Sequence, residues 1–173
     1  MHPILIVFLF GISVLLWVIW QRAHKPQPQP QPPREHYVRA VQLRIARPVT
    51  ELETSTRMYR DGLGLAMLGR FENHQGFDGV MLGTHDADYH FEFTQCRDHA
   101  IAPQPTVEDL IVFYLADDEA WQHRCQSMRD AGFLEAASFN PYWDQHGRTF
   151  VDNDGYRTIL QNGSWRHAPA SKN

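Results

Sequence analysis

Cysteine is scarce in this chain of 173 residues: only Cys96 and Cys125 occur, and they form no CxxC pair. This count argues against a zinc knuckle or a disulfide framework and predicts two free thiols. A basic cluster is also lacking, since 16 lysines and arginines are scattered among 20 acidic residues and the net charge is −4. We therefore expect no nucleic-acid partner. The sequence contains neither a GxSxG nucleophile elbow nor a phosphate-binding glycine loop.

The N-terminus contains an uncharged apolar run, PILIVFLFGISVLLWVIW, over residues 3–20. As a helix it would span about 27 Å, roughly one hydrocarbon thickness. Arg22 and Lys25 follow it, so the positive-inside rule predicts that the C-terminal domain is cytoplasmic. A cleaved signal peptide is the alternative, but no lysine or arginine precedes the run. The sequence thus predicts a single-pass transmembrane anchor over residues 1–22.

A proline-glutamine segment, KPQPQPQPP, follows the predicted anchor within residues 23–34. Alternating proline excludes a helix or a central strand and favours an extended polyproline II rod. We expect it to hold the folded domain away from the bilayer.

The remaining chain contains an internal repeat, which we assign to one domain over residues 35–165, with a tail at 166–173. Residues 41–71 and 110–139 each read as a strand, an amphipathic helix, a glycine stop and a second strand. Further strands close each half. The predicted fold is α+β, with two tandem βαβββ modules at about 38–96 and 106–163 that enclose a groove.

These residues resemble a known family. The segments LRIARPVTELETSTRMYRDGLGL and GRTFVDNDGYRTIL look like the vicinal oxygen chelate superfamily, which includes glyoxalases, bleomycin-resistance proteins and extradiol dioxygenases. The segments RIARP, FENHQGFDGVM, YHFEFTQ and NPYW are similar to its YycE-like bacterial subgroup. The resemblance covers about residues 38–163 and implies a ligand-binding groove between the two modules.

The resemblance also implies where a metal would bind. Metal-dependent members place a His, Gln or Glu at the start of the first strand of each module and a Glu or His on each last strand. Aligned here, these positions fall at Ala40, Glu92, Asp109 or Leu110, and Ile159. A catalytic divalent site normally keeps about three protein ligands. We therefore expect no cofactor; a divalent metal remains an alternative, with Glu92 as its weak candidate ligand.

The stretch HDADYHFEF, residues 85–93, concentrates the polar groups that could serve a site. Its first part, THDAD, is typical of a turn. In the strand that follows, Tyr89, Phe91 and Phe93 point to one face and His90, Glu92 and Thr94 to the other. We interpret the first face as core and the second as groove.

The first strand alternates in the same way. We expect Val41, Leu43 and Ile45 to pack inward and Gln42, Arg44 and Ala46 to face the groove. In the family that this chain resembles, these two strands are neighbours, which implies that Arg44 could pair with Glu92. The candidate ligand-binding residues are Gln42, Arg44, His90, Glu92, Tyr142 and Trp143. Candidates for acid/base catalysis are His90 and Glu92.

Two other motifs leave alternatives open. Tyr142 and Trp143 could form an aromatic wall over the groove, or they could pack in the core. The run Asp152-Asn153-Asp154-Gly155 has the composition of a calcium loop, but no glutamate stands at the twelfth position, so a turn is expected.

Three functions are compatible with these observations. The leading hypothesis is a membrane-anchored protein that binds an unidentified small molecule without a metal. The second is an enzyme, either a metal-free acid/base catalyst or a lyase or oxygenase with a reduced ligand set. The third is an interaction scaffold. The sequence leaves a homodimer open.

Overall fold

A computed structural model describes residues 42–166, which lie within one compact unit, Ala40–Asn173. The predicted membrane anchor and proline-glutamine segment fall outside the described residues. Within residues 42–166, no helix is both long enough and apolar enough to cross a membrane.

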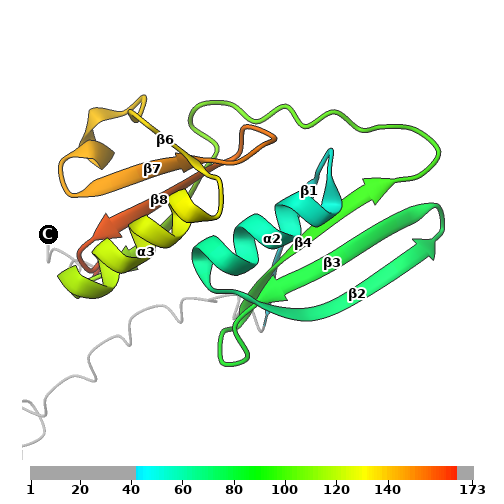
Figure 1. Cartoon of the computed structure of the whole chain (residues 1–173), viewed down its shortest axis with the longest axis horizontal. Helices are drawn as coiled ribbons and strands as arrows, with labels where there is room; N and C mark the ends of the chain where they lie inside the picture. The colour runs from blue at the N-terminus through cyan, green and yellow to red at the C-terminus, as the bar shows by residue number, and fades with distance from the viewer. Residues whose placement is uncertain (1–41, 167–173) are drawn as a thin grey trace, which may run out of the picture. The chain divides into compact units, whose positions relative to one another are not determined.

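Module one forms a four-stranded sheet with one helix on it (Figure 1). Its elements are β1 (Leu43–Pro48), α2 (Leu52–Leu63), β2 (Ala66–His74), β3 (Phe77–Gly83) and β4 (Tyr89–Cys96). The strand order is β1-β4-β3-β2, in which β1 runs parallel to β4 and the other neighbours are antiparallel.

Module two repeats this order with one insertion. Its elements are β5 (Leu110–Leu115), α3 (Asp118–Asp130), β6 (Leu134–Ala136), the 3₁₀ helix η1 (Pro141–Asp144), β7 (Gly147–Val151) and β8 (Arg157–Asn162). The strand order is β5-β8-β7-β6, again with a parallel first pair. The predicted α+β fold with two small sheets is confirmed.

The helix boundaries follow from the local sequence. Asp117 is the N-cap residue of α3, because its carboxylate accepts a hydrogen bond from the Ala120 amide at 2.8 Å. After α2, Gly64 has φ +71°, a left-handed conformation that glycine adopts without steric cost. Gly132 lies two residues after the end of α3 and is also left-handed, with φ +96°. The predicted glycine stops are therefore present in both modules.

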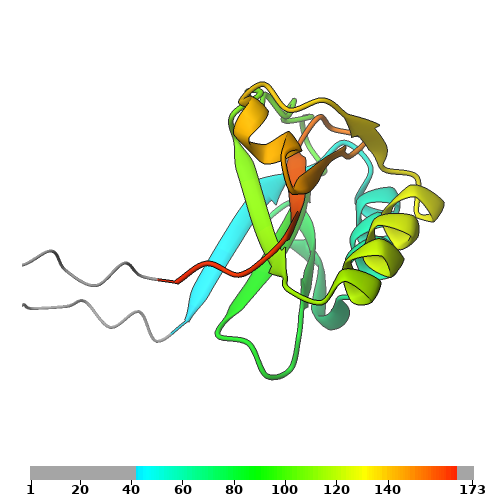
Figure 2. The ribbon, with the colours of Figure 1, turned by 90° about the vertical axis from the view of Figure 1, so that its left-hand side faces the viewer.

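The hydrophobic core joins the two modules. Figure 2 shows α2 and α3 next to each other on the same side of the strands. Tyr59 of α2 is fully buried. Its ring centroid lies 5.6 Å from that of Phe91 and 4.6 Å from that of Phe93, both on β4, and 5.3 Å from that of Phe133 in module two. As predicted, the odd-numbered aromatic residues of β4 face the core.

The prediction that Leu43 packs inward is wrong, because Leu43 is 54% exposed. It lies at the start of β1, which is an edge strand, whereas α2 packs mainly on β3 and β4. Farther along the same strand, Ile45 is half-buried against the core.

The two predicted turns are confirmed. His85, Asp86 and Asp88 are exposed between β3 and β4. Asp152–Gly155 connects β7 to β8, with Gly155 at φ +88°. This second turn also reaches module one, where Thr50 donates to Asp154 through its amide (3.2 Å) and through its hydroxyl.

A buried polar network continues this contact between the modules. The Tyr59 hydroxyl donates to Asp152 Oδ2 at 3.0 Å, and Arg47 Nη1 donates to the Tyr59 oxygen at 3.3 Å. Asp152 Oδ1 accepts from the amides of Asp154 and Tyr156, each at 2.9 Å. Burial raises the pKa of both Tyr59 and Asp152. The turn is therefore part of the structure that holds the modules together.

Candidate functional site

Arg44, His90 and Glu92 form a hydrogen-bonded cluster on two adjacent strands. The parallel register of β1 and β4 places Arg44 beside His90 and Ala46 beside Glu92. Arg44 Nη1 donates to Glu92 Oε2 at 2.8 Å, so the predicted contact is present. Arg44 Nε also donates to His90 Nε2 at 2.9 Å. This nitrogen can accept only when it carries no proton, so the contact requires the neutral tautomer with hydrogen on Nδ1.

The cluster lies on the face of the sheet opposite α2, because successive β4 side chains alternate and Phe91 and Phe93 face α2. We call this face, with Arg44, Ala46, His90, Glu92 and Thr94, the open face of module one. The Glu92 side chain is only 14% exposed, whereas that of Arg44 is 53% exposed. A carboxylate that is largely removed from water is thus neutralised by a guanidinium that still reaches solvent.

Arg44 retains binding capacity. A guanidinium has five N–H donors in a rigid plane, and two atoms, Nε and Nη1, are used within the cluster. The Nη2 amino group has no partner among residues 42–166 and can donate to a carboxylate or phosphate oxygen.

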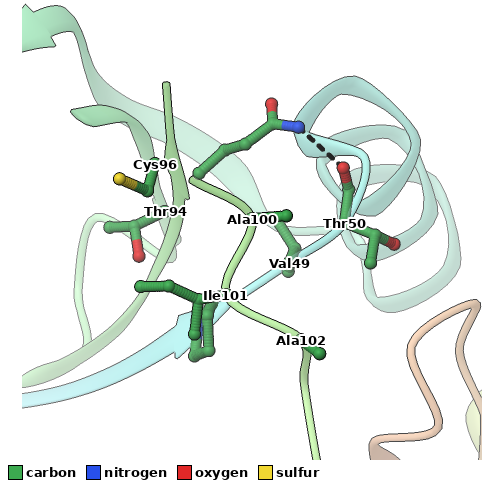
Figure 3. A pocket seen from close by; sticks show the side chains of 9 residues that line it. Val49, Thr50, Thr94, Cys96, Ala100, Ile101 and Ala102 are labelled. Atoms are coloured by element: carbon green, nitrogen blue, oxygen red, sulfur yellow. Dashed lines mark hydrogen bonds between the residues drawn. The ribbon is translucent and has the colours of Figure 1, made fainter. Parts of the chain in front are cut away.

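A pocket lies where β1 and β4 end (Figure 3). The register places Pro48 beside Thr94, two residues further along each strand than Ala46 and Glu92, and therefore on the same face of the sheet. Both Pro48 and Thr94 line the pocket, whose volume is about 180 Å³, together with residues 100–102. The Gln95 amide donates to the Thr50 carbonyl at 2.7 Å beside it. A molecule held by Arg44 could therefore extend its apolar part toward Thr94 and Ile101.

The other predicted ligand-binding residues are not brought into this cluster. Gln42 is exposed just before β1, and no described contact joins it to Arg44, His90 or Glu92. Tyr142 and Trp143 lie in η1, which packs on β7 of module two. Their ring centroids are 5.0 Å apart, and Tyr142 is 54% exposed. They contact each other rather than forming a wall beside Arg44.

The structure also pairs Cys96 with a histidine, which the sequence analysis missed. Cys96 Sγ lies 3.7 Å from His99 Nδ1, and Cys96 lines the pocket of Figure 3. The C-x-x-H spacing was the available signal. Both cysteines are free thiols, as predicted.

The repeat corrects the alignment of the metal positions. Leu110 is eight residues before the start of α3 and pairs with Arg157, two residues before Ile159. Arg44 is eight residues before the start of α2 and pairs with His90, two residues before Glu92. Arg44, not Ala40, is therefore the counterpart of Leu110. Neither an arginine nor a leucine ligates a divalent metal, and no cluster of metal-binding side chains occurs within residues 42–166.

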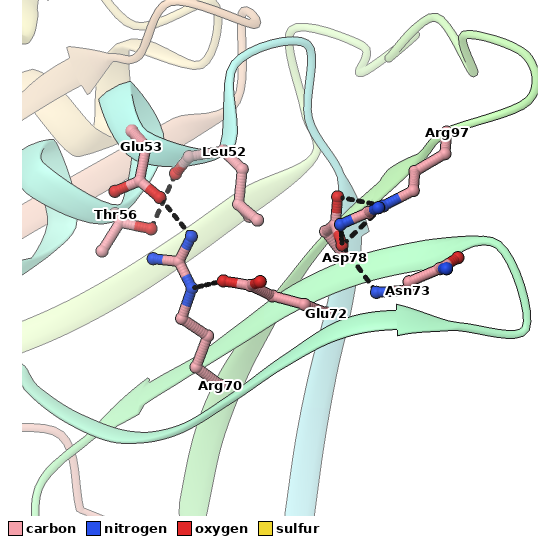
Figure 4. Close-up of polar contacts among 8 residues, drawn as sticks. All are labelled: Leu52, Glu53, Thr56, Arg70, Glu72, Asn73, Asp78 and Arg97. Carbon is pink, nitrogen blue, oxygen red and sulfur yellow. Dashed lines mark hydrogen bonds and ion pairs between the residues drawn. The ribbon is translucent and has the colours of Figure 1, made fainter.

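A second polar cluster lies where α2 begins beside β2 and β3 (Figure 4). Arg70 contacts Glu53 at 2.5 Å and Glu72 at 3.4 Å, while Arg97 contacts Asp78 at 2.7 Å. The Arg97 guanidinium, aided by the Asn73 amide, lowers the pKa of Asp78. Because each arginine here already has a carboxylate partner, we interpret this cluster as structural. Such exposed pairs contribute little to stability.

Known proteins similar to this chain share its fold. The model of the YycE-like N-terminal domain matches residues 43–94, and that of the YycE-like C-terminal domain matches residues 108–162. The chain is 42% identical over 123 residues to the YycE protein of Bacillus subtilis (strain 168), covering 71% of this chain and 88% of that protein.

Solved structures agree with this match. A crystal structure of a YycE protein from Bacillus subtilis has a TM-score of 0.68 at 39% identity, covering 77% of this chain and 95% of that chain. Leishmania major glyoxalase I has a TM-score of 0.55 at 18% identity, with 69% and 84% covered. The fosfomycin resistance protein FosX from Mesorhizobium loti has a TM-score of 0.53 at 15% identity, with 70% and 90% covered. At these last two identities the likeness concerns the fold alone.

Proposed function

This chain belongs to the YycE-like family of the vicinal oxygen chelate superfamily, and on that premise we propose that it binds a small oxyanion-bearing molecule on the open face of module one without a metal. One observation carries the proposal: Arg44 bonds both His90 and Glu92 and keeps N–H donors for a ligand. The ligand oxyanion would meet the guanidinium, and its apolar part would occupy the pocket beside Thr94.

The position of Arg44 supports metal-free binding. Metal-dependent relatives in the superfamily carry ligands at the first-strand and last-strand positions, which correspond here to Arg44 and Glu92. A fixed guanidinium repels a divalent cation, and at 2.8 Å it already neutralises the Glu92 carboxylate. The arginine thus supplies the positive charge that a metal would otherwise supply. Charge-assisted bonds from a planar guanidinium to an oxyanion are short and directional.

Three further features remain proposals. The apolar segment 3–20 would anchor the chain in a membrane, with the folded domain in the cytoplasm, and the domain could form a homodimer. Carbonate extraction of membranes from cells expressing the full-length chain tests the anchor: residues 3–20 predict retention in the pellet, and release of the chain by carbonate would contradict an integral anchor.

Binding can be tested by thermal unfolding of the full-length chain against a panel of small carboxylates and phosphonates, with and without EDTA. We expect at least one compound to raise the melting temperature in both conditions; a ligand at 100 times its Kd stabilises by about 2.7 kcal/mol. Arg44→Gln should abolish this rise. The matched control is Arg57→Gln, since Arg57 is an exposed arginine of α2 that forms no ion pair among the described residues.

Two outcomes would overturn the proposal. The first is stabilisation by a divalent metal that disappears in Glu92→Ala. The second is that every compound that stabilises the wild-type chain stabilises Arg44→Gln equally. Turnover of a bound compound, lost in Glu92→Gln while binding remains, would instead favour the acid/base enzyme.

A further inference from the structure

A second pocket lies between the modules, away from the open face. Its volume is about 180 Å³, and it is lined by residues from α2, β4, β5, α3 and β8. Tyr89 is among them, and it points to the opposite face of β4 from His90. The two sites are therefore separated by the sheet itself.

The interior of this pocket is apolar and partly aromatic. Its walls include Leu63, Leu65, Leu115 and Leu160 together with the rings of Tyr89 and Phe113. These two ring centroids are 6.3 Å apart at an interplanar angle of 51°, and both residues line the space. A cavity of about 150 Å³ lined by apolar side chains can bind benzene. A single six-membered ring therefore fits the size and the lining.

Arg124 is the charged residue among those that line the pocket. None of its nine lining residues is acidic, and Arg124 forms no ion pair within residues 42–166. Arg124 Nη1 donates to the Gly62 carbonyl at 3.2 Å, which helps to cap α2. That carbonyl satisfies one of the five N–H donors and carries no full charge. Thr84 and Tyr114 add hydroxyl groups to the lining.

The guanidinium is also held in place. A Cβ built on Gly64 would lie 2.5 Å from Arg124 Nη1 and 2.9 Å from Nη2, so the guanidinium packs directly on this glycine. Arg124 is half-buried, and a half-buried cation gains more from an anionic partner than one in bulk water. From the ring-sized apolar space and this unpaired, fixed cation, we propose that the pocket between the modules binds a monocyclic aromatic carboxylate, with the carboxylate on Arg124 and the ring beside Tyr89 and Phe113.

The proposal can be tested in the wild-type, full-length chain by NMR with labelled leucine and alanine methyl groups and benzoate as the probe. We expect saturable shifts at Leu63, Leu65, Leu115 and Leu160. Ala46, which stands beside Glu92 on the open face, and the exposed Leu134 of β6 should not shift. Shifts at Ala46 without shifts in the pocket would place benzoate on the open face and overturn the proposal.

Two comparisons test the role of the charge. Benzamide, which keeps the ring but lacks the charge, should bind about tenfold more weakly than benzoate, because one charge-assisted contact is lost. Arg124→Gln should weaken benzoate binding by about the same factor, while Arg57→Gln and Arg44→Gln should leave the benzoate-induced shifts of the pocket leucines unchanged. Equal binding of benzoate and benzamide to the wild-type chain would overturn the proposal even if Arg124→Gln does not fold. The Arg44→Gln variant separates this site from the proposed function.

Discussion

The two modules have the same order of helix and strands but carry different residues at equivalent positions. In module one, Arg44 and Glu92 meet on β1 and β4. The corresponding residues of module two are Leu110 and Ile159. Glu92 keeps 14% of its side chain exposed, whereas Ile159 is completely buried. The repeat therefore provides two similar sheets, but only module one retains a polar pair at this position.

A difference in one connection explains why Ile159 is covered. In module one, β2 turns directly into β3 at Gln75–Gly76. In module two, residues 137–146 connect β6 to β7 and include η1. Ser138 Oγ, in this connection, lies 2.5 Å from Thr149 Oγ1 of β7. Thr149 is paired with Ile159 of the neighbouring strand β8. Because directly paired residues share a face of the sheet, this connection packs over the face that module one leaves open.

The comparison also shows that module two has a structural task. Its Asp152–Gly155 turn supplies the carboxylates that bind Tyr59 and Thr50 of module one. Under the proposed function, module one carries the oxyanion site, and the Asp152–Gly155 turn of module two helps to close the shared core.

The largest effect is expected from exchanging the two equivalent residues. Ile159→Glu should destabilise the fold by about 3 kcal/mol or more, because it places a carboxyl group in a fully buried position without a cationic partner. Glu92→Ile should cost about 1 kcal/mol or less, since it removes an ion pair with a half-exposed arginine. Urea denaturation measures both values.

A matched control separates polarity from volume at this position. Ile159→Val removes one methylene and should cost about 1 kcal/mol. If Ile159→Glu were no more destabilising than Ile159→Val, the face of module two would be accessible to water and the contrast between the modules would be lost.

The next effect concerns the contact between modules. Asp152→Ala should destabilise by about 2–4 kcal/mol, because it leaves the Tyr59 hydroxyl and two backbone amides without their acceptor. Asp98→Ala is the control, as Asp98 is exposed and forms no described hydrogen bond or ion pair. Both variants can be compared by chemical denaturation with tyrosine and tryptophan fluorescence. If Asp152→Ala destabilised the fold no more than Asp98→Ala does, the turn would not support module one.

The smallest effect is a difference in acid sensitivity between two aspartates. Arg97 lowers the pKa of Asp78 in module one, so this contact stabilises the fold above the unfolded pKa of about 3.9 and is lost as pH falls through the lower folded value. Burial raises the pKa of Asp152 in module two, so its contribution has the opposite sign: it is present below the unfolded pKa and is lost as pH rises through the folded value.

Replacing each aspartate separates these contributions. Asp78→Asn should reduce the loss of stability between about pH 6 and about pH 3, a range from about two units above to about one unit below the ordinary aspartate pKa of about 3.9. Asp152→Asn should increase it, because the opposing contribution is removed. The free energy of unfolding as a function of pH gives both slopes. Slopes that change in the same direction in the two variants would contradict this assignment.

Much of the fold and part of the site could be predicted from the sequence, because they depend on local patterns. Alternation along residues 89–94 predicted the two faces of β4, and the family resemblance, which makes β1 and β4 neighbours, predicted the contact between Arg44 and Glu92. Glycine at 64 and 132 marked the helix ends. The same rule failed at Leu43, because alternation assigns a side chain to a face but does not say whether a helix covers that part of the face.

Contacts that depend on tertiary structure were harder to predict from the sequence. The alignment with the family placed the first-strand position of module one at Ala40, whereas strand register shows that Arg44 is the counterpart of Leu110. The pairing of Cys96 with His99 depends on the conformation of the loop after β4. Likewise, nothing in the NPYW motif indicated that it packs on module two, away from Arg44.

The sequence by itself determined the doubled βαβββ pattern, the family and the polar face of β4, because these follow from periodicity and from residues close together in the chain. The tertiary structure alone decided which module keeps an accessible polar pair, how Asp152 joins the modules, and where Arg124 lies beside a ring-sized pocket. Each of these depends on side chains from segments far apart in sequence, whose meeting is set by packing of the shared core rather than by any local preference.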